Sequence, residues 1–102
     1  MGYSKKEIYK FTKKLYNLLR NHSDHIYFKK LYSNVYGQYN DQTQDITIDF
    51  RRDIISTLVH EALHHWYPDW SETKVLKHES LIMNALSARQ IKNILRIIGE
   101  TI

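Results

Sequence analysis

Residues 53–66 read DIISTLVHEALHHW, a segment with the pattern of an amphipathic helix. Asp53 is a favourable N-terminal cap, and Pro68 ends the helix because the residue before a proline avoids helical geometry. The apolar residues crowd one side of this helix: Ile55, Leu58, Val59, Ala62, Leu63 and Trp66. We therefore expect the helix to rest on a hydrophobic core through that side and to present its polar side chains across it.

This helix carries the pattern H-E-x-x-H at positions 60–64. His60 and His64 are four residues apart, so both imidazoles lie on one face and can bind one metal ion at about 2.0–2.1 Å. Glu61 flanks that face, where a carboxylate can take a proton from a water molecule that the metal activates. The pattern predicts one zinc ion, bound by His60 and His64, with Glu61 as the catalytic base. His65 is rotated away and is expected at the surface.

A catalytic zinc ion usually has a third protein ligand, and the next predicted helix, from Ser71 to about Leu86, offers candidates. Glu79 lies at the centre of an apolar stripe, where an unpaired carboxylate would be unfavourable. A zinc ion would compensate that charge, and so would a buried salt bridge. Glu72 and His78 are weaker candidates, because the helix dipole explains an acidic residue in the first turn and His78 lies off the stripe. The stripe consists of Val75, Leu76, Ile82, Met83 and Leu86.

The flanking segments predict an α+β fold. An N-terminal helix is expected from Ser4 to about Arg20, with Ser4 and Glu7 forming a capping box. Residues 26–32, 35–39 and 46–50 predict three short antiparallel strands, with a polar turn at 40–45. A C-terminal helix is expected from Ala88 to Ile98, closed by Gly99. The chain has the size of one domain, to which we assign residues 1–102.

The composition excludes several classes of protein. The chain has no cysteine, which excludes disulfides and thiolate zinc sites, and it has no apolar stretch typical of a signal peptide or a membrane span. We therefore expect a cytoplasmic protein. Its net charge of +4 arises in residues 1–51, which hold nine basic and five acidic residues. Such a half can attract nucleic acid, but a solvated helix face explains lysines at helical spacing better.

The pattern at 60–64, followed by Glu79 on the next helix, resembles the gluzincin clan of zinc metallopeptidases. The short chain and the order of its predicted elements resemble the minigluzincins, minimal soluble counterparts of the catalytic domains of membrane-embedded peptidases such as the CAAX proteases. The order of elements covers most of the chain, whereas the residue-level match is confined to 60–64 and 79. The resemblance implies a zinc metalloendopeptidase with His60, His64 and Glu79 as ligands and Glu61 as general base and acid.

The resemblance also implies how a substrate binds. An edge strand would form the rim of a cleft and take up a peptide or protein substrate as an added strand. We assign this rim to residues 36–40, with Gly37, Gln38 and Tyr39 as substrate-binding residues. Minigluzincins are described as zymogens blocked by a terminal segment. The apolar residues 94–98 would supply such a plug, although a core helix explains them better.

One position departs from the family pattern, and one role has no assigned residue. Many gluzincins carry an aspartate four residues after the ligand glutamate, hydrogen-bonded to a zinc-bound histidine, and here that position is Met83. The electrophile that would stabilise the oxyanion is not singled out. Its candidates are Tyr36, Tyr39, Tyr67, His78 and Arg89.

Two other functions fit the same residues. H-E-x-x-H proteins include regulatory peptidases that cleave phage repressors or proteins crosslinked to DNA. In SprT-like enzymes the third ligand resembles a histidine, for which His78 would serve, and the basic half would bind DNA in a salt-sensitive way. The other alternative is a non-catalytic basic module that binds a partner or nucleic acid. The lack of cysteine argues against that module, because structural zinc is usually closed by four protein ligands, often cysteines.

Overall fold

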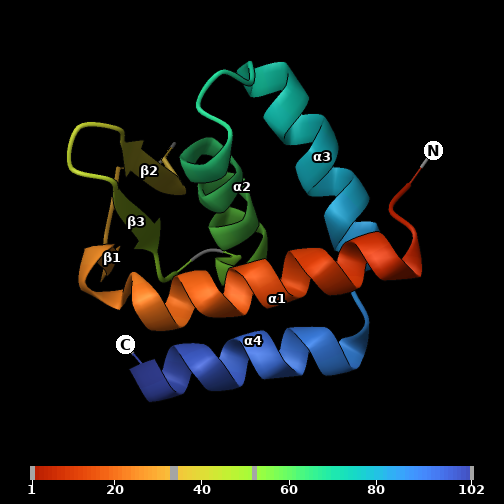
Figure 1. Cartoon of the computed structure of the whole chain (residues 1–102). Coiled ribbons are helices and arrows are strands. Elements are labelled where there is room, and N and C mark those ends of the chain that lie inside the picture. Colours follow the sequence, from red (N-terminus) through yellow and green to blue (C-terminus); the bar gives the residue numbers. More distant parts are fainter. Residues whose placement is uncertain (1, 33–34, 52, 102) are drawn as a thin grey trace.

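The computed structural model describes residues 2–32, 35–51 and 53–101, and these form the α+β fold that the sequence predicts. Figure 1 shows α2 between the sheet and α3, with α1 and α4 side by side along the same edge of the molecule. In chain order the elements are α1 (Lys5–Asn21), the 3₁₀ turn η1 (Ser23–His25), β1 (Ile26–Lys29), β2 (Gly37–Asn40), β3 (Asp45–Asp49), α2 (Ile54–Trp66), α3 (Glu72–Ala85) and α4 (Ala88–Thr101).

Helices α1 and α4 pack against each other and close one side of the core. Ser4 starts α1 with the predicted capping box: its hydroxyl accepts from the Glu7 amide at 3.1 Å, and its amide donates to the Glu7 carboxylate at 2.9 Å. In α4, Ile94 and Ile97 are buried in the core. Residues 94–98 therefore belong to a core helix, which is the better of the two interpretations of that segment.

Helix α4 continues through Gly99 to Thr101, so the prediction that Gly99 closes it is wrong. A glycine ends a helix by adopting the left-handed conformation, and no glycine in the described chain has a positive φ. Gly99 is instead an ordinary helical residue.

The sheet has the strand order β1-β3-β2, so β3 is central and β2 lies at an edge. Strands β2 and β3 form the predicted antiparallel hairpin. Strand β1 runs parallel to β3, with Ile26 opposite Ile46, so the prediction of a wholly antiparallel sheet is wrong. Burial explains the order: Ile46, Ile48 and Asp49 of β3 are fully buried, and the strand with the most buried residues has a neighbour on each side.

Asp49 is a buried carboxylate at the end of β3, and its oxygens are fully partnered. The Arg51 guanidinium lies 2.7 Å from Oδ2 and 2.9 Å from Oδ1, and the Leu31 amide donates to Oδ2 at 3.1 Å. The Arg51 hydrogen bonds hold the pKa of Asp49 well below its ordinary value. Because Leu31 follows β1, this carboxylate fastens the chain after β1 to the central strand.

Helix α3 is capped by the predicted Ser71, whose hydroxyl accepts from the Lys74 amide, and it packs on the core through Val75 and Ile82. Leu76, expected in the buried stripe, is 52% exposed because it lies on the side that lines a cleft. None of the helices in the described part of the chain is long and apolar enough to span a membrane.

Candidate metal centre

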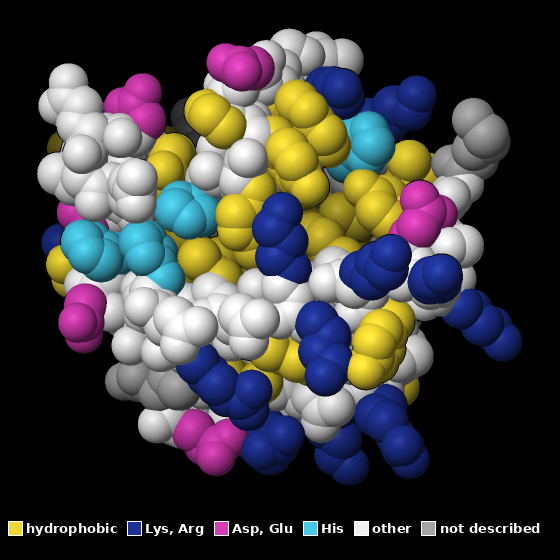
Figure 2. Space-filling model, in the orientation of Figure 1, with side chains coloured by type: hydrophobic (Ala, Val, Ile, Leu, Met, Phe, Trp, Pro, Cys, Tyr) yellow, Lys and Arg dark blue, Asp and Glu magenta, His cyan; other side chains and the backbone are white. Residues whose placement is uncertain are grey.

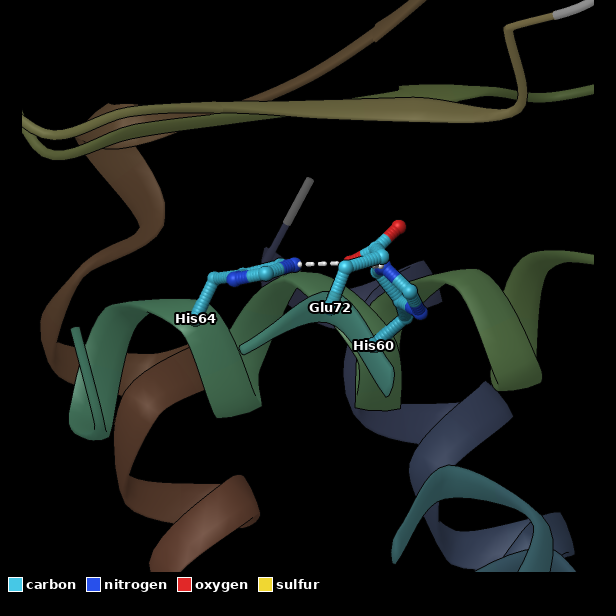
Figure 3. Close-up of side chains that lie close together, drawn as sticks. All are labelled: His60, His64 and Glu72. Atoms are coloured by element: carbon cyan, nitrogen blue, oxygen red, sulfur yellow. Dashed lines mark hydrogen bonds and ion pairs between the residues drawn. The ribbon is translucent and has the colours of Figure 1, made fainter. Parts of the chain in front are cut away.

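The two histidines of α2 project from the same side of the helix, toward the start of α3 (Figure 3). The centroids of the His60 and His64 rings are 4.9 Å apart, and both side chains are half-buried. Helix α2 is anchored beneath them by fully buried residues, and Asp53 caps it by accepting from the Ser56 amide. A fixed helix therefore holds both imidazoles in place. The anchoring residues are Leu58, Val59, Ala62 and Leu63.

Glu72, the first residue of α3, reaches both imidazoles. Its Oε1 lies 2.8 Å from His64 Nε2 and 3.1 Å from His60 Nε2. These three side chains form a group that can hold a metal ion, since one ligand atom from each lies within 4.8 Å of the others. The sequence makes Glu72 only a weaker candidate, and the structure brings it, rather than Glu79, into this group.

The donor set is compatible with a zinc ion. Two ligand atoms at about 2.0–2.1 Å from one tetrahedral ion are roughly 3.3 Å apart, close to the 2.8 and 3.1 Å separations here. When His60 Nδ1–H donates to Glu79, its Nε2 presents a lone pair to another acceptor, the Glu72 carboxylate. A cation between two facing acceptors removes their repulsion, so the arrangement suits a bound metal.

Glu79 contacts the other nitrogen of His60. Its Oε1 lies 2.6 Å from His60 Nδ1, and its side chain is 23% exposed. A carboxylate in this position fixes the orientation of the ring and leaves Nε2 free to bind a metal. Glu79 is thus placed to orient the His60 ring.

Glu61 follows His60 in α2 and is only 6% exposed. Burial raises the pKa of Glu61 to about 7; His60 opposes this rise, and the carboxylates of Glu72 and Glu79 add to it. Within residues 2–32, 35–51 and 53–101, no group donates a hydrogen bond to the Glu61 carboxylate. Because Glu61 also lines the cleft, its oxygens are available to a molecule bound there.

A cleft passes the metal-binding group between β2 and the helices α2 and α3. One half has a volume of about 430 Å³ and the other about 490 Å³. The halves share Gly37, His60, Glu61 and Glu72, so they meet at the candidate metal centre. The first half is further lined by Val35, Tyr36, Ser56, Thr57, Leu76 and Glu79, and the second by Gln38, Tyr39, Asp41, His64 and Pro68.

The predicted substrate-binding residues Gly37, Gln38 and Tyr39 lie on the edge strand β2 and line the second half of the cleft. The Asp49 amide donates to the Tyr36 carbonyl at 2.8 Å. Because hydrogen-bonded pairs alternate along an antiparallel ladder, the backbone groups of Gly37 and Tyr39 point away from β3. Among residues 2–32, 35–51 and 53–101 they make no backbone hydrogen bond outside the β2–β3 ladder, so these groups can pair with an added strand.

Strand β2 passes so close to α2 that only glycine fits at position 37. A Cβ there would lie 2.6 Å from Thr57 Cγ2 and 2.9 Å from Glu61 Oε2. Gly37 does not have a positive φ, so its role is this close approach and not an unusual backbone conformation. The glycine brings the backbone of the edge strand next to Glu61.

Gly37→Ala is expected to lower the free energy of unfolding by about 1–3 kcal/mol, the usual effect of overpacking. Urea unfolding measures this change. Adding Thr57→Ser, which removes the clashing Cγ2, should restore part of the loss. Gly99→Ala is the matched control, because a Cβ at Gly99 meets nothing within 4 Å. Equal stability of Gly37→Ala and the parent would show that β2 does not approach α2 so closely.

The other predicted residues have different surroundings. His78 faces away from the cleft, with its Nδ1 2.7 Å from the Tyr3 hydroxyl. His65 Nδ1 lies 3.0 Å from the Tyr39 hydroxyl, so that hydroxyl is engaged outside the metal-binding group. Of the residues proposed as electrophiles, Tyr36 and Tyr39 line the cleft, whereas Tyr67, His78 and Arg89 are absent from its described lining.

Comparison of the chain with protein-family models, with curated proteins and with solved structures finds no match. The resemblance to the minigluzincins therefore stays a prediction, and the geometry of the site itself carries the argument about function.

Proposed function

We propose that the protein is a zinc-dependent metalloendopeptidase. The observation that carries this proposal is the convergence of His60 Nε2, His64 Nε2 and Glu72 Oε1 beside the buried Glu61, at the point where the two halves of a cleft meet. Three protein ligands leave one position of a tetrahedral ion open, which favours a catalytic over a structural site.

In this proposal His60, His64 and Glu72 hold the ion, and Glu79 orients the His60 ring through Nδ1. A zinc ion bound there would act as a Lewis acid that polarises the scissile carbonyl and makes water more acidic. Glu61 accepts the proton of the attacking water and delivers it to the departing amine. Its free carboxylate, buried beside the two histidines, supports this role.

The substrate would be an extended peptide that pairs with the free edge of β2. The backbone groups of Gly37 and Tyr39 offer hydrogen bonds to it, and Gly37 brings that edge next to Glu61. The cleft continues on both sides of Glu61, which suits cleavage within a chain. Its described lining includes Asp41, Glu61, Glu72 and Glu79 but no lysine or arginine, which favours substrates that are not acidic near the cleaved bond.

The geometry favours this function over the alternatives. A SprT-like ligand set needs a third histidine, whereas His78 is bound to Tyr3 on the other side of α3. Latency gains no support, because no described residue of α1 or α4 lines either half of the cleft. A non-catalytic module would not explain why a cleft and a buried carboxylate, Glu61, adjoin the metal-binding group.

Metal removal tests the proposal. The purified protein is expected to hold one zinc ion per chain by elemental analysis and to cleave an unfolded protein such as casein. A zinc chelator should abolish cleavage, and zinc added back should restore it. Cleavage that continues after the metal is removed, or zinc-loaded protein that cuts no unfolded substrate, would contradict the proposal.

A further inference from the structure

A second surface of interest lies between α1 and α3, on the far side of α3 from the cleft. Figure 2 shows hydrophobic side chains gathered there, with lysine and arginine side chains around them. We call this surface the lysine–aromatic face. It consists of Lys14, Trp66, Tyr67, Trp70, Lys74, Lys77 and His78.

Three rings of this face lie in a row. Tyr67 and Trp70 are parallel, with centroids 4.3 Å apart and an interplanar angle of 11°. His78 lies next in the row, with its centroid 4.5 Å from that of Trp70 and its ring tilted by 42°. Tyr67 is 37% exposed, and Trp66 and Trp70 are half-buried. The exposed part of Tyr67 offers a ring surface of the kind on which unpaired bases stack.

Ammonium groups lie over these rings from both helices. Lys14 Nζ is 4.5 Å from the Trp66 centroid and 4.9 Å from that of Tyr67, and Lys74 Nζ is 4.5 Å from the Trp70 centroid. The described part of the chain contains no ion pair between a lysine and a carboxylate. Burial lowers the pKa of His78, and Lys74 and Lys77 lower it further, in keeping with a positive potential. The charge on this face therefore lacks an anionic partner within the described residues.

Helix α3 separates the two functional surfaces. Glu72, Leu76 and Glu79 lie on its cleft side, whereas Lys74 and His78 lie on the side toward Trp70. A ligand on the lysine–aromatic face would thus leave the cleft open to a peptide. The acidic residues near this face are few: Glu7 is held in the cap of α1, and Asp69 lies in the turn before Trp70.

We propose that the lysine–aromatic face binds single-stranded nucleic acid. Phosphates would pair with the lysines, and bases would stack on the ring row that Tyr67 and Trp70 begin. A duplex would satisfy the lysines but keeps its bases stacked inside, so it would not use the rings. The proposal is independent of the peptidase activity, because none of these residues lines the cleft.

The chain offers an internal probe for this proposal. Its two tryptophans, Trp66 and Trp70, both belong to the lysine–aromatic face. Titration with a dT20 oligonucleotide is therefore expected to quench the tryptophan fluorescence, with a Kd in the micromolar range at about 0.1 M salt. A hairpin duplex and heparin are the comparison ligands, and both should bind more weakly and quench less.

Variants distinguish binding at the lysine–aromatic face from nonspecific attraction to the net positive charge of the chain. Lys74→Ala with Lys77→Ala is expected to reduce the slope of log K against log salt by about 1.4, since each phosphate contact contributes about 0.7. Lys29→Ala with Lys30→Ala removes the same charge at β1 and should leave the slope unchanged. Tyr67→Leu should weaken dT20 binding about tenfold, measured by anisotropy of a labelled oligonucleotide.

Several results would overturn the proposal. One is that dT20 binds to saturation without quenching the tryptophan fluorescence. Another is that the duplex or heparin binds as tightly as dT20 or more tightly. A third is that the two double-lysine variants reduce the salt slope equally. All four lysines are exposed, so neither double variant endangers the core.

Discussion

Glu61→Gln is expected to slow peptide cleavage by about 10²–10⁴-fold while the protein keeps its zinc, because glutamine preserves the shape of the side chain but cannot accept a proton. Glu61 contributes no atom to the metal-binding group of His60, His64 and Glu72, so the zinc content should not change. Single-turnover cleavage of a fluorogenic peptide, together with elemental analysis of the same sample, measures both quantities.

Two measurements distinguish this role from a structural one. Burial disfavours the ionised form of Glu61, so the neutral glutamine should leave the free energy of unfolding equal or higher. Ser56→Ala is the matched control, because Ser56 lines the same half of the cleft without touching the metal-binding group. If Glu61→Gln cleaves at the parental rate, or if its activity falls only because it unfolds, Glu61 is not the base.

Glu72→Ala is expected to weaken zinc binding more than Glu79→Gln does. Glu72 Oε1 lies within reach of both Nε2 atoms, whereas Glu79 touches only His60 Nδ1. Mutation of a carboxylate that hydrogen-bonds a ligand histidine typically lowers metal affinity by 10–100-fold, so Glu79→Gln, which keeps an acceptor but removes the charge, should show a loss of about that size at most. Competition with a chromophoric zinc chelator gives both affinities.

Thr73→Ala is the control for this pair, because Thr73 is exposed in the same first turn of α3. The Glu72 side chain is 62% exposed, and its removal loses mainly a favourable interaction with the helix dipole. The free energy of unfolding measured in urea should therefore change by about 1 kcal/mol or less. If Glu79→Gln lowers zinc affinity more than Glu72→Ala, the third ligand is Glu79, as the family resemblance implies.

Local rules of sequence predicted most of the helices. Ser4, Asp53 and Ser71 each cap a helix, and each hydroxyl or carboxylate accepts from an amide three residues on. The sheet order could not be derived in the same way. Strand-forming residues at 26–32 and apolar alternation at 46–50 predict two of the strands, but these patterns do not say which strand has two neighbours or in which direction β1 runs.

In the candidate site, too, one part can be predicted from local sequence and the other depends on the tertiary structure. The spacing of His60 and His64 on one helix fixes their relative position, and no tertiary information is needed for it. The position of a carboxylate on α3 relative to the two histidines depends on the path of residues 67–71, which sequence patterns do not give. Glu72, Leu76 and Glu79 are spaced i, i+4 and i+7, so one face of α3 could have been read as a shared site.

The role of Gly37 is another feature that the sequence could not predict. Its residue type is consistent with a strand edge or a turn, and only the structure reveals that a side chain there would meet Thr57 and Glu61. The same holds for the lysine–aromatic face, because Lys14 and Lys74 are far apart in sequence and come to lie over rings of the same face only when α1 packs near α3.

The most direct measurement is a crystal structure of the zinc-loaded protein with anomalous data collected at the zinc absorption edge. We predict a single strong peak bonded to His60 Nε2, His64 Nε2 and a Glu72 oxygen, with Glu79 still hydrogen-bonded to His60 Nδ1. A peak elsewhere in the molecule, or an unchanged group of side chains with no zinc between them, would contradict the metal centre on which the proposed activity rests.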